Sequence, residues 1–112
     1  MTDEELVRKV WKSVHIEQRG EQILRIFDGG IIVRQEDYTD AAQRTRAYLE
    51  KVRQKQEEID LLKAEESIWP NHFAEHPAFA RILFLLEAQL AELESGLTDW
   101  AKAHVEELLK EH

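Results

Sequence analysis

The stretch that decides the fold of this 112-residue chain is Trp69-Pro70-Asn71-His72-Phe73-Ala74-Glu75-His76-Pro77. Two prolines bracket it, and a proline interrupts a helix that runs into it. An apolar stripe with alternating three- and four-residue steps leads up to this segment, and a second such stripe leads away from it. This spacing predicts two long helices whose apolar stripes face each other, with the turn between them at residues 68–77.

Folding the chain at this turn tests whether the two stripes match. Their members are, before the turn, Tyr38, Ala41, Thr45, Tyr48, Val52, Ile59, Leu62 and Trp69, and after it Phe79, Leu83, Leu86, Leu90, Leu93, Leu97, Trp100 and His104. One register places Ile59 opposite Leu86 and also places Thr45 opposite Trp100. We therefore predict a long antiparallel, coiled-coil-like helical hairpin over residues 38–112.

Charge supports the same orientation. Residues 44–55 carry five cations and one anion, and antiparallel pairing would place them beside Glu92, Glu94 and Asp99. Exposed ion pairs contribute only about 0.2–1 kcal/mol each, so this pattern indicates orientation more than stability.

The N-terminal third predicts a helix and a short β-hairpin. Thr2 and Glu5 fit a capping box, and the apolar spacing beyond them predicts a helix over about residues 3–17, within the segment 1–20. In residues 22–34, Asp28-Gly29-Gly30 separates two apolar, β-branched runs, which favours a hairpin. The alternative is a short helix ending at Gly29.

The last helix contains one ambiguous position, Gly96. It is either a break followed by a cap at Thr98 or a small residue inside one helix, and we favour a continuous helix because the stripe keeps its phase. The expected fold is mainly α: one domain over residues 1–112, completed by dimerisation.

Composition restricts the classes of function. The formal net charge of −8 disfavours a broad nucleic-acid surface, which requires clustered cations. There is no cysteine, so no disulfide or thiolate metal site is expected. The N-terminus is acidic and the longest apolar run is short, so we expect a cytoplasmic protein with no membrane partner.

One motif could carry metal chemistry. His72, Glu75 and His76 match H-x-x-E-H, the pattern of zinc peptidases in which two histidines on adjacent helical turns bind zinc. A metal-dependent hydrolase is therefore one alternative function. Pro77 disfavours helical geometry at His76. We expect a polar turn here, with no catalytic, cofactor or metal site.

A second alternative is a small DNA-binding regulator. A hairpin between helices is similar to the wing of winged-helix regulators, and Arg19, Arg25 and Arg34 would then contact phosphates. Only about 20 residues precede the hairpin, too few for the helix-turn-helix that such proteins use.

The third helix carries apolar groups all round its surface near the turn, including Ile82, Phe84 and Leu85. A helix of this kind is buried on every side, so a second copy or another part of the chain must cover it. We expect a non-enzymatic interaction or adaptor module that forms a homodimer and binds another protein. The predicted contact residues are Trp11, Trp69, Phe73, Phe79, Ile82 and Phe84. The alternative is that they fill the monomer's own core.

Overall fold

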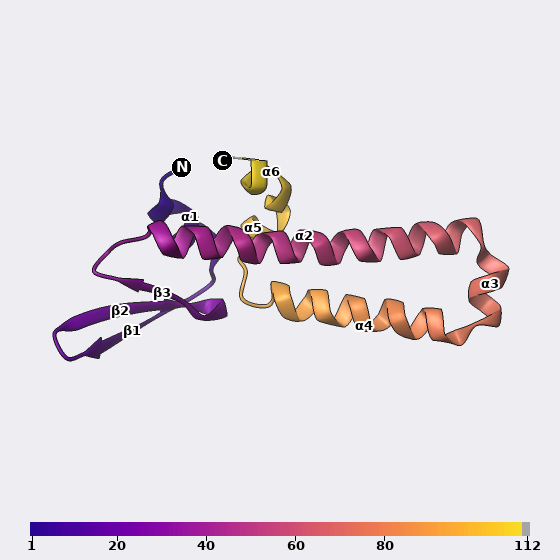
Figure 1. The fold of residues 1–112 in the computed structure, drawn as a ribbon, viewed down its shortest axis with the longest axis horizontal. Helices are drawn as coiled ribbons and strands as arrows, with labels where there is room; N and C mark the ends of the chain where they lie inside the picture. Colours follow the sequence, from indigo (N-terminus) through magenta and orange to yellow (C-terminus); the bar gives the residue numbers. More distant parts are fainter. Residues whose placement is uncertain (111–112) are drawn as a thin grey trace. The chain divides into compact units, whose positions relative to one another are not determined.

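The computed structural model describes residues 1–110, apart from the side chains of His72 and Phe73. It is mainly helical, with one three-stranded antiparallel sheet (Figure 1). In chain order the elements are α1 (Asp3–Val10), β1 (Val14–Arg19), β2 (Gln22–Phe27), η1 (Asp28–Gly30), β3 (Ile31–Arg34), α2 (Thr39–Ile68), α3 (Pro70–Glu75), α4 (Pro77–Glu94), α5 (Asp99–Ala103) and α6 (Val105–Lys110). The contacts group into two compact units. Unit 1 comprises Met1–Glu50 with Gly96–His112, and unit 2 comprises Lys51–Ser95.

In unit 1 the first helix is shorter than predicted. The Thr2 hydroxyl caps α1 by accepting a hydrogen bond from the Glu5 amide at 3.2 Å, as the capping pattern predicted. The helix ends at Val10, however, and Trp11 has extended backbone angles. The prediction of a helix to residue 17 is therefore wrong, because residues 14–19 form strand β1.

Pairing with β2 explains why these residues leave the helix. β1 is antiparallel to β2 over its whole length, from Val14 opposite Phe27 to Arg19 opposite Gln22. A two-residue turn joins the strands, and Gly20 adopts the positive φ of 62° that tight hairpins need. Val14 and Ile16 are β-branched and favour a strand. Beyond Trp11, Val14 alone continues the helical apolar spacing, and one such side chain cannot outweigh this pairing.

The predicted hairpin over residues 22–34 is confirmed. β2 pairs antiparallel with β3, and Ile26 lies opposite Ile32. Gly29 and Gly30 both have positive φ, which allows the reversal at Asp28–Gly30. The alternative of a short helix ending at Gly29 is wrong, and the sheet has the strand order β1-β2-β3.

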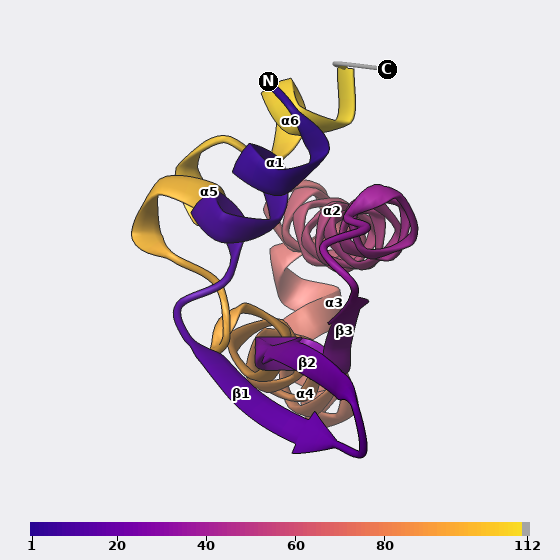
Figure 2. The same cartoon turned by 90° about the vertical axis from the view of Figure 1, so that its left-hand side faces the viewer.

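Trp11 is central to the core of unit 1. It is 3% exposed, and its ring lies 4.9 Å from that of Tyr48 in an edge-to-face arrangement. α1 also contacts α5, and Figure 2 shows these two helices side by side. The Arg8 guanidinium donates to the Tyr38 hydroxyl at 3.0 Å, connecting α1 to the start of α2.

The break after α4 corrects the prediction of a continuous helix across Gly96. Thr98 is the N-cap of α5, and its hydroxyl also donates to the Lys9 carbonyl at 2.6 Å. The Thr98 amide donates to the Val10 carbonyl at 2.9 Å, and the Lys12 amide donates to the Gly96 carbonyl at 3.0 Å. Backbone pairing with the end of α1 thus replaces the helical hydrogen bonds of residues 96–98. The phase of the apolar stripe could not reveal this competition.

Unit 2 contains the helical hairpin. The second half of α2 and α4 lie side by side in opposite directions, joined through α3 (Figure 1). The Lys55 ammonium donates to the Gln89 side chain at 3.1 Å. The register that pairs Ile59 with Leu86 would place Lys55 opposite Leu90, one residue further along α4. Ile59 is 2% exposed. The antiparallel helix–helix contact predicted for this part of the chain is confirmed, and α2 ends one residue beyond the expected position.

Several cations of α2 form ion pairs within α2 or with α1. Arg44 pairs with Asp40 at 3.0 Å, Arg53 with Glu57 at 3.3 Å and Lys55 with Glu58 at 3.3 Å, all within α2. Arg46 lies 3.9 Å from Asp3 of α1. Short i,i+3 and i,i+4 separations make these local pairs easy to form. The predicted pairing of this block with Glu92, Glu94 and Asp99 stays a prediction.

Candidate functional site

The candidate site is the outward surface of α4 in unit 2. Pro77 occupies the first helical position, where its missing N–H is harmless. Leucine, alanine and glutamate dominate the sequence that follows, and these residues favour a helix. The helix therefore forms for local reasons, and its apolar groups must be covered by neighbours or remain in water.

α2 is the neighbour of α4 within unit 2, and it covers only one stripe of the helix. The residues of that stripe, Leu83, Leu86, Leu90 and Leu93, are half-buried. Of the α4 residues, all of which the structure describes, none is fully buried. A single helix hairpin cannot enclose a helix with apolar groups on every side. Among the described residues of unit 2, a large part of the α4 surface therefore has no apolar partner.

The remaining apolar groups lie in the surface of unit 2. Phe84 is 75% exposed, and Ile82 and Leu85, within one turn of it, are also exposed. Trp69 is 64% exposed at the end of α2, beside the exposed Ile68. Single exposed apolar residues are ordinary, but clusters of large ones on a folded chain mark sites that contact another molecule.

The six predicted contact residues differ in how exposed they are in the structure. Trp69, Ile82 and Phe84 are exposed, and Phe79 is half-buried. Trp11 belongs to the core of unit 1 instead. The side chain of Phe73 lies outside the described residues. Sequence reasoning left Leu85 out of the set, although its position one residue after Phe84 on an apolar helix could have indicated it.

A surface pocket lies beside this apolar surface, at the turn end of unit 2. It has a volume of about 360 Å³. Phe84, Leu83 and Pro70 contribute apolar walls, and Glu66 and Glu87 place carboxylates at its edge. Such a pocket could receive an apolar side chain from another polypeptide.

The H-x-x-E-H segment does not lie on one helix. α3 ends at Glu75, and His76 precedes α4 with backbone angles outside the helical region. Glu75 and His76 are exposed, and the side chain of His72 is not described. Within the described residues, no group of three or more His, Cys, Asp or Glu side chains is placed to hold a metal ion.

The cations of the sheet are largely matched by nearby carboxylates. Arg19 lies 2.9 Å from Glu17, and Arg25 lies 3.1 Å from Glu36. Arg34 lines a pocket of about 470 Å³ in unit 1 together with Arg44, Asp37 and Asp40, so two carboxylates face its two cations. These carboxylates reduce the positive potential that phosphate contacts would require.

In the described part of the chain, every helix is too short or too polar to cross a lipid bilayer. Comparison of the chain with protein-family models, with curated proteins and with solved structures gave no match in any of the three.

Proposed function

We propose that this protein is a non-enzymatic interaction or adaptor module that self-associates and binds other polypeptides through the long helices of unit 2. The observation that carries the proposal is the exposure of large apolar residues along α4, where Phe84, Leu85 and Ile82 face water. Burying one such side chain is worth about 1.5–3 kcal/mol, so a partner that covers several of them gains substantial free energy.

The same surface has the composition of an interface centre. Trp69 and Phe84 are aromatic, and aromatic side chains are enriched among the residues that dominate binding energy. Carboxylates such as Glu66 and Glu87 border it and would form a polar rim. An adaptor needs a surface of this kind and no reactive group.

Sedimentation velocity over micromolar to millimolar concentrations tests the proposal. We expect the wild-type chain to associate as its concentration rises and the double variant Phe84→Gln, Leu85→Gln to remain monomeric. Glutamine favours a helix and both positions are exposed, so the variant should retain its circular dichroism spectrum and melting temperature.

The matched control is Ile16→Gln, Ile23→Gln, which removes two exposed apolar groups from the sheet of unit 1. It should associate like the wild type. A wild-type chain that is monomeric at every concentration would contradict the self-association. Equal association of all three proteins would contradict the assignment to α4.

A further inference from the structure

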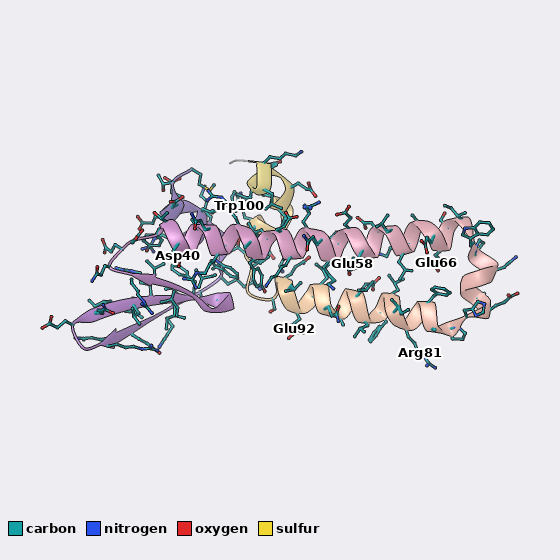
Figure 3. All side chains as sticks on the ribbon, viewed as in Figure 1. Asp40, Glu58, Glu66, Arg81, Glu92 and Trp100 are labelled. Atoms are coloured by element: carbon teal, nitrogen blue, oxygen red, sulfur yellow. The ribbon has the colours of Figure 1, made fainter. Side chains whose placement is uncertain are left out.

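Four residues of α4 recur at steps of four, three and four residues: Arg81, Leu85, Ala88 and Glu92. This spacing places them on one face of the helix. All four are exposed. Figure 3 shows Arg81 and Glu92 projecting from α4 on the side turned away from α2. We call this face, made of Arg81, Leu85, Ala88 and Glu92, the outer seam.

The order of residues along the outer seam is self-complementary. It runs from a cation through a large apolar residue and a small apolar residue to an anion. A second α4 placed antiparallel to the first puts Arg81 opposite the partner's Glu92 and Leu85 opposite the partner's Ala88. The same register puts Ile82, beside the seam, opposite the partner's Ala91. Large residues meet small ones, as interdigitating helices require.

We propose that two copies of this chain pair through their outer seams, antiparallel about a two-fold axis between residues 86 and 87, with Arg81 of each copy bound to the partner's Glu92. This inference rests on the proposed function, because it names the partner and the register of the surface described there. A parallel arrangement would place Arg81 beside the partner's Arg81 and Glu92 beside the partner's Glu92, which like-charge repulsion disfavours.

Two further observations favour a second copy. First, neither Arg81 nor Glu92 has an ion pair with any other residue that the structure describes. Second, their positions oppose the helix dipole, since Arg81 lies toward the positive N-terminal end of α4 and Glu92 toward its negative end. An antiparallel partner supplies the opposite charge at both ends. A two-fold interface also requires a self-complementary surface, which the outer seam provides.

The length of the seam sets the strength of the dimer. Eleven residue steps separate Arg81 and Glu92, about 16 Å of helix at 1.5 Å per residue. A helix pair of this length buries less than the ~1,600 Å² of a standard stable interface. We therefore expect a reversible dimer with a dissociation constant in the micromolar range.

Charge reversal tests the register. Arg81→Glu would place a carboxylate against the partner's Glu92 at both ends of the pair, and Glu92→Arg would place two guanidinium groups together. Either variant alone should weaken dimerisation about tenfold, as two attractive pairs become repulsive. The double variant Arg81→Glu, Glu92→Arg should dimerise like the wild type. Sedimentation equilibrium gives the dissociation constants.

Mixing the two single variants is a second test. In the mixed dimer both contacts become attractive, so an equimolar mixture should regain the dimer that each variant loses. Glu21→Arg is the control, because it makes the same change of charge at an exposed position in unit 1. It should dimerise normally, and mixing it with Arg81→Glu should give no comparable recovery.

The outcomes separate this inference from the proposed function. A wild-type dimer that both single variants leave unchanged would overturn the register while the proposed self-association stands. A wild-type dimer that the single variants weaken but the double variant does not restore would also overturn it. A wild-type chain that never dimerises would overturn both.

Discussion

The indole Nε1 of Trp11 donates a 3.0 Å hydrogen bond to the hydroxyl of Thr45, and both side chains are buried in unit 1. The Thr45 hydroxyl donates in turn to the Ala41 carbonyl at 2.7 Å. The indole N–H and the hydroxyl O–H therefore both have a hydrogen-bond acceptor inside the core. The contact attaches the end of α1 to the first half of α2.

Replacing Thr45 by valine should therefore destabilise the protein, although valine keeps nearly the same side-chain shape as threonine. The Trp11 indole would lose its acceptor, and a buried donor without a partner costs about 1–3 kcal/mol. Urea unfolding of Thr45→Val measures this loss. In a Trp11→Phe background, which has no indole N–H, the same substitution should cost less. Equal costs in the two backgrounds would contradict the role of this hydrogen bond.

Gly29 and Gly30 form a matched pair for a second prediction. Both have positive φ, so alanine at either position meets backbone strain of about 1–2 kcal/mol. A Cβ at Gly29 would also lie 2.7 Å from the Trp11 ring, whereas one at Gly30 meets nothing within 4 Å. Gly29→Ala should cost about 1–3 kcal/mol more than Gly30→Ala. Equal thermal stability of the two variants would show that Trp11 moves away without cost.

The turn between β3 and α2 offers a stabilising change. Gln35 and Glu36 have φ of 50° and 61°, a conformation that Asn and Gly adopt far more readily. Gln35→Asn with Glu36→Gly should raise the free energy of unfolding by about 1 kcal/mol. Glu36→Ala serves as the control, since it removes only the exposed contact with Arg25. An unchanged free energy of unfolding in the Asn-Gly variant would mean that the backbone at residues 35 and 36 is unstrained.

Burial within unit 2 leads to a further prediction. Ile59 is 2% exposed and Leu61, two residues later on α2, is 63% exposed. Ile59→Ala should lower the free energy of unfolding by about 2–5 kcal/mol, because it leaves a cavity between α2 and α4. Leu61→Ala should change it by no more than about 0.5 kcal/mol. Similar losses at both positions would contradict the packing of this hairpin.

The helices that the sequence predicted well are those with local signals. The prolines at 70 and 77 and the apolar stripes were sufficient to locate α2, the reversal of chain direction and the start of α4, but they did not predict that residues 70–75 of the expected turn form helix α3. The hairpin of β2 and β3 also followed from a local signal, the glycines after Asp28.

Elements that depend on distant pairing were missed. β1 exists because β2 lies beside it, and the break at Gly96 exists because Thr98 bonds to the end of α1. Thr45, expected opposite Trp100, instead binds Trp11. Periodicity within one segment contains no information about such partners. The sequence predicted only part of the candidate surface, because burial depends on such distant partners. Helical periodicity identified Ile82 and Phe84 on α4, but only the tertiary structure shows that Trp11 is buried.

The central claim is that the outer seam of α4 contacts a second copy in antiparallel orientation. Because the chain has no cysteine, single cysteines at Glu87 and at Ala80, which are exposed and lie beside the outer seam rather than on it, can carry spin labels for distance measurement between the two copies. The register places position 87 next to the two-fold axis and position 80 about 6.5 residues from it, so at 1.5 Å per residue the two labels are offset along the helices by about 2 Å at 87 and about 20 Å at 80, and the distance at 80 should exceed that at 87 by ~10 Å. Equal distances at the two positions, or no magnetic coupling between copies, would contradict the claim.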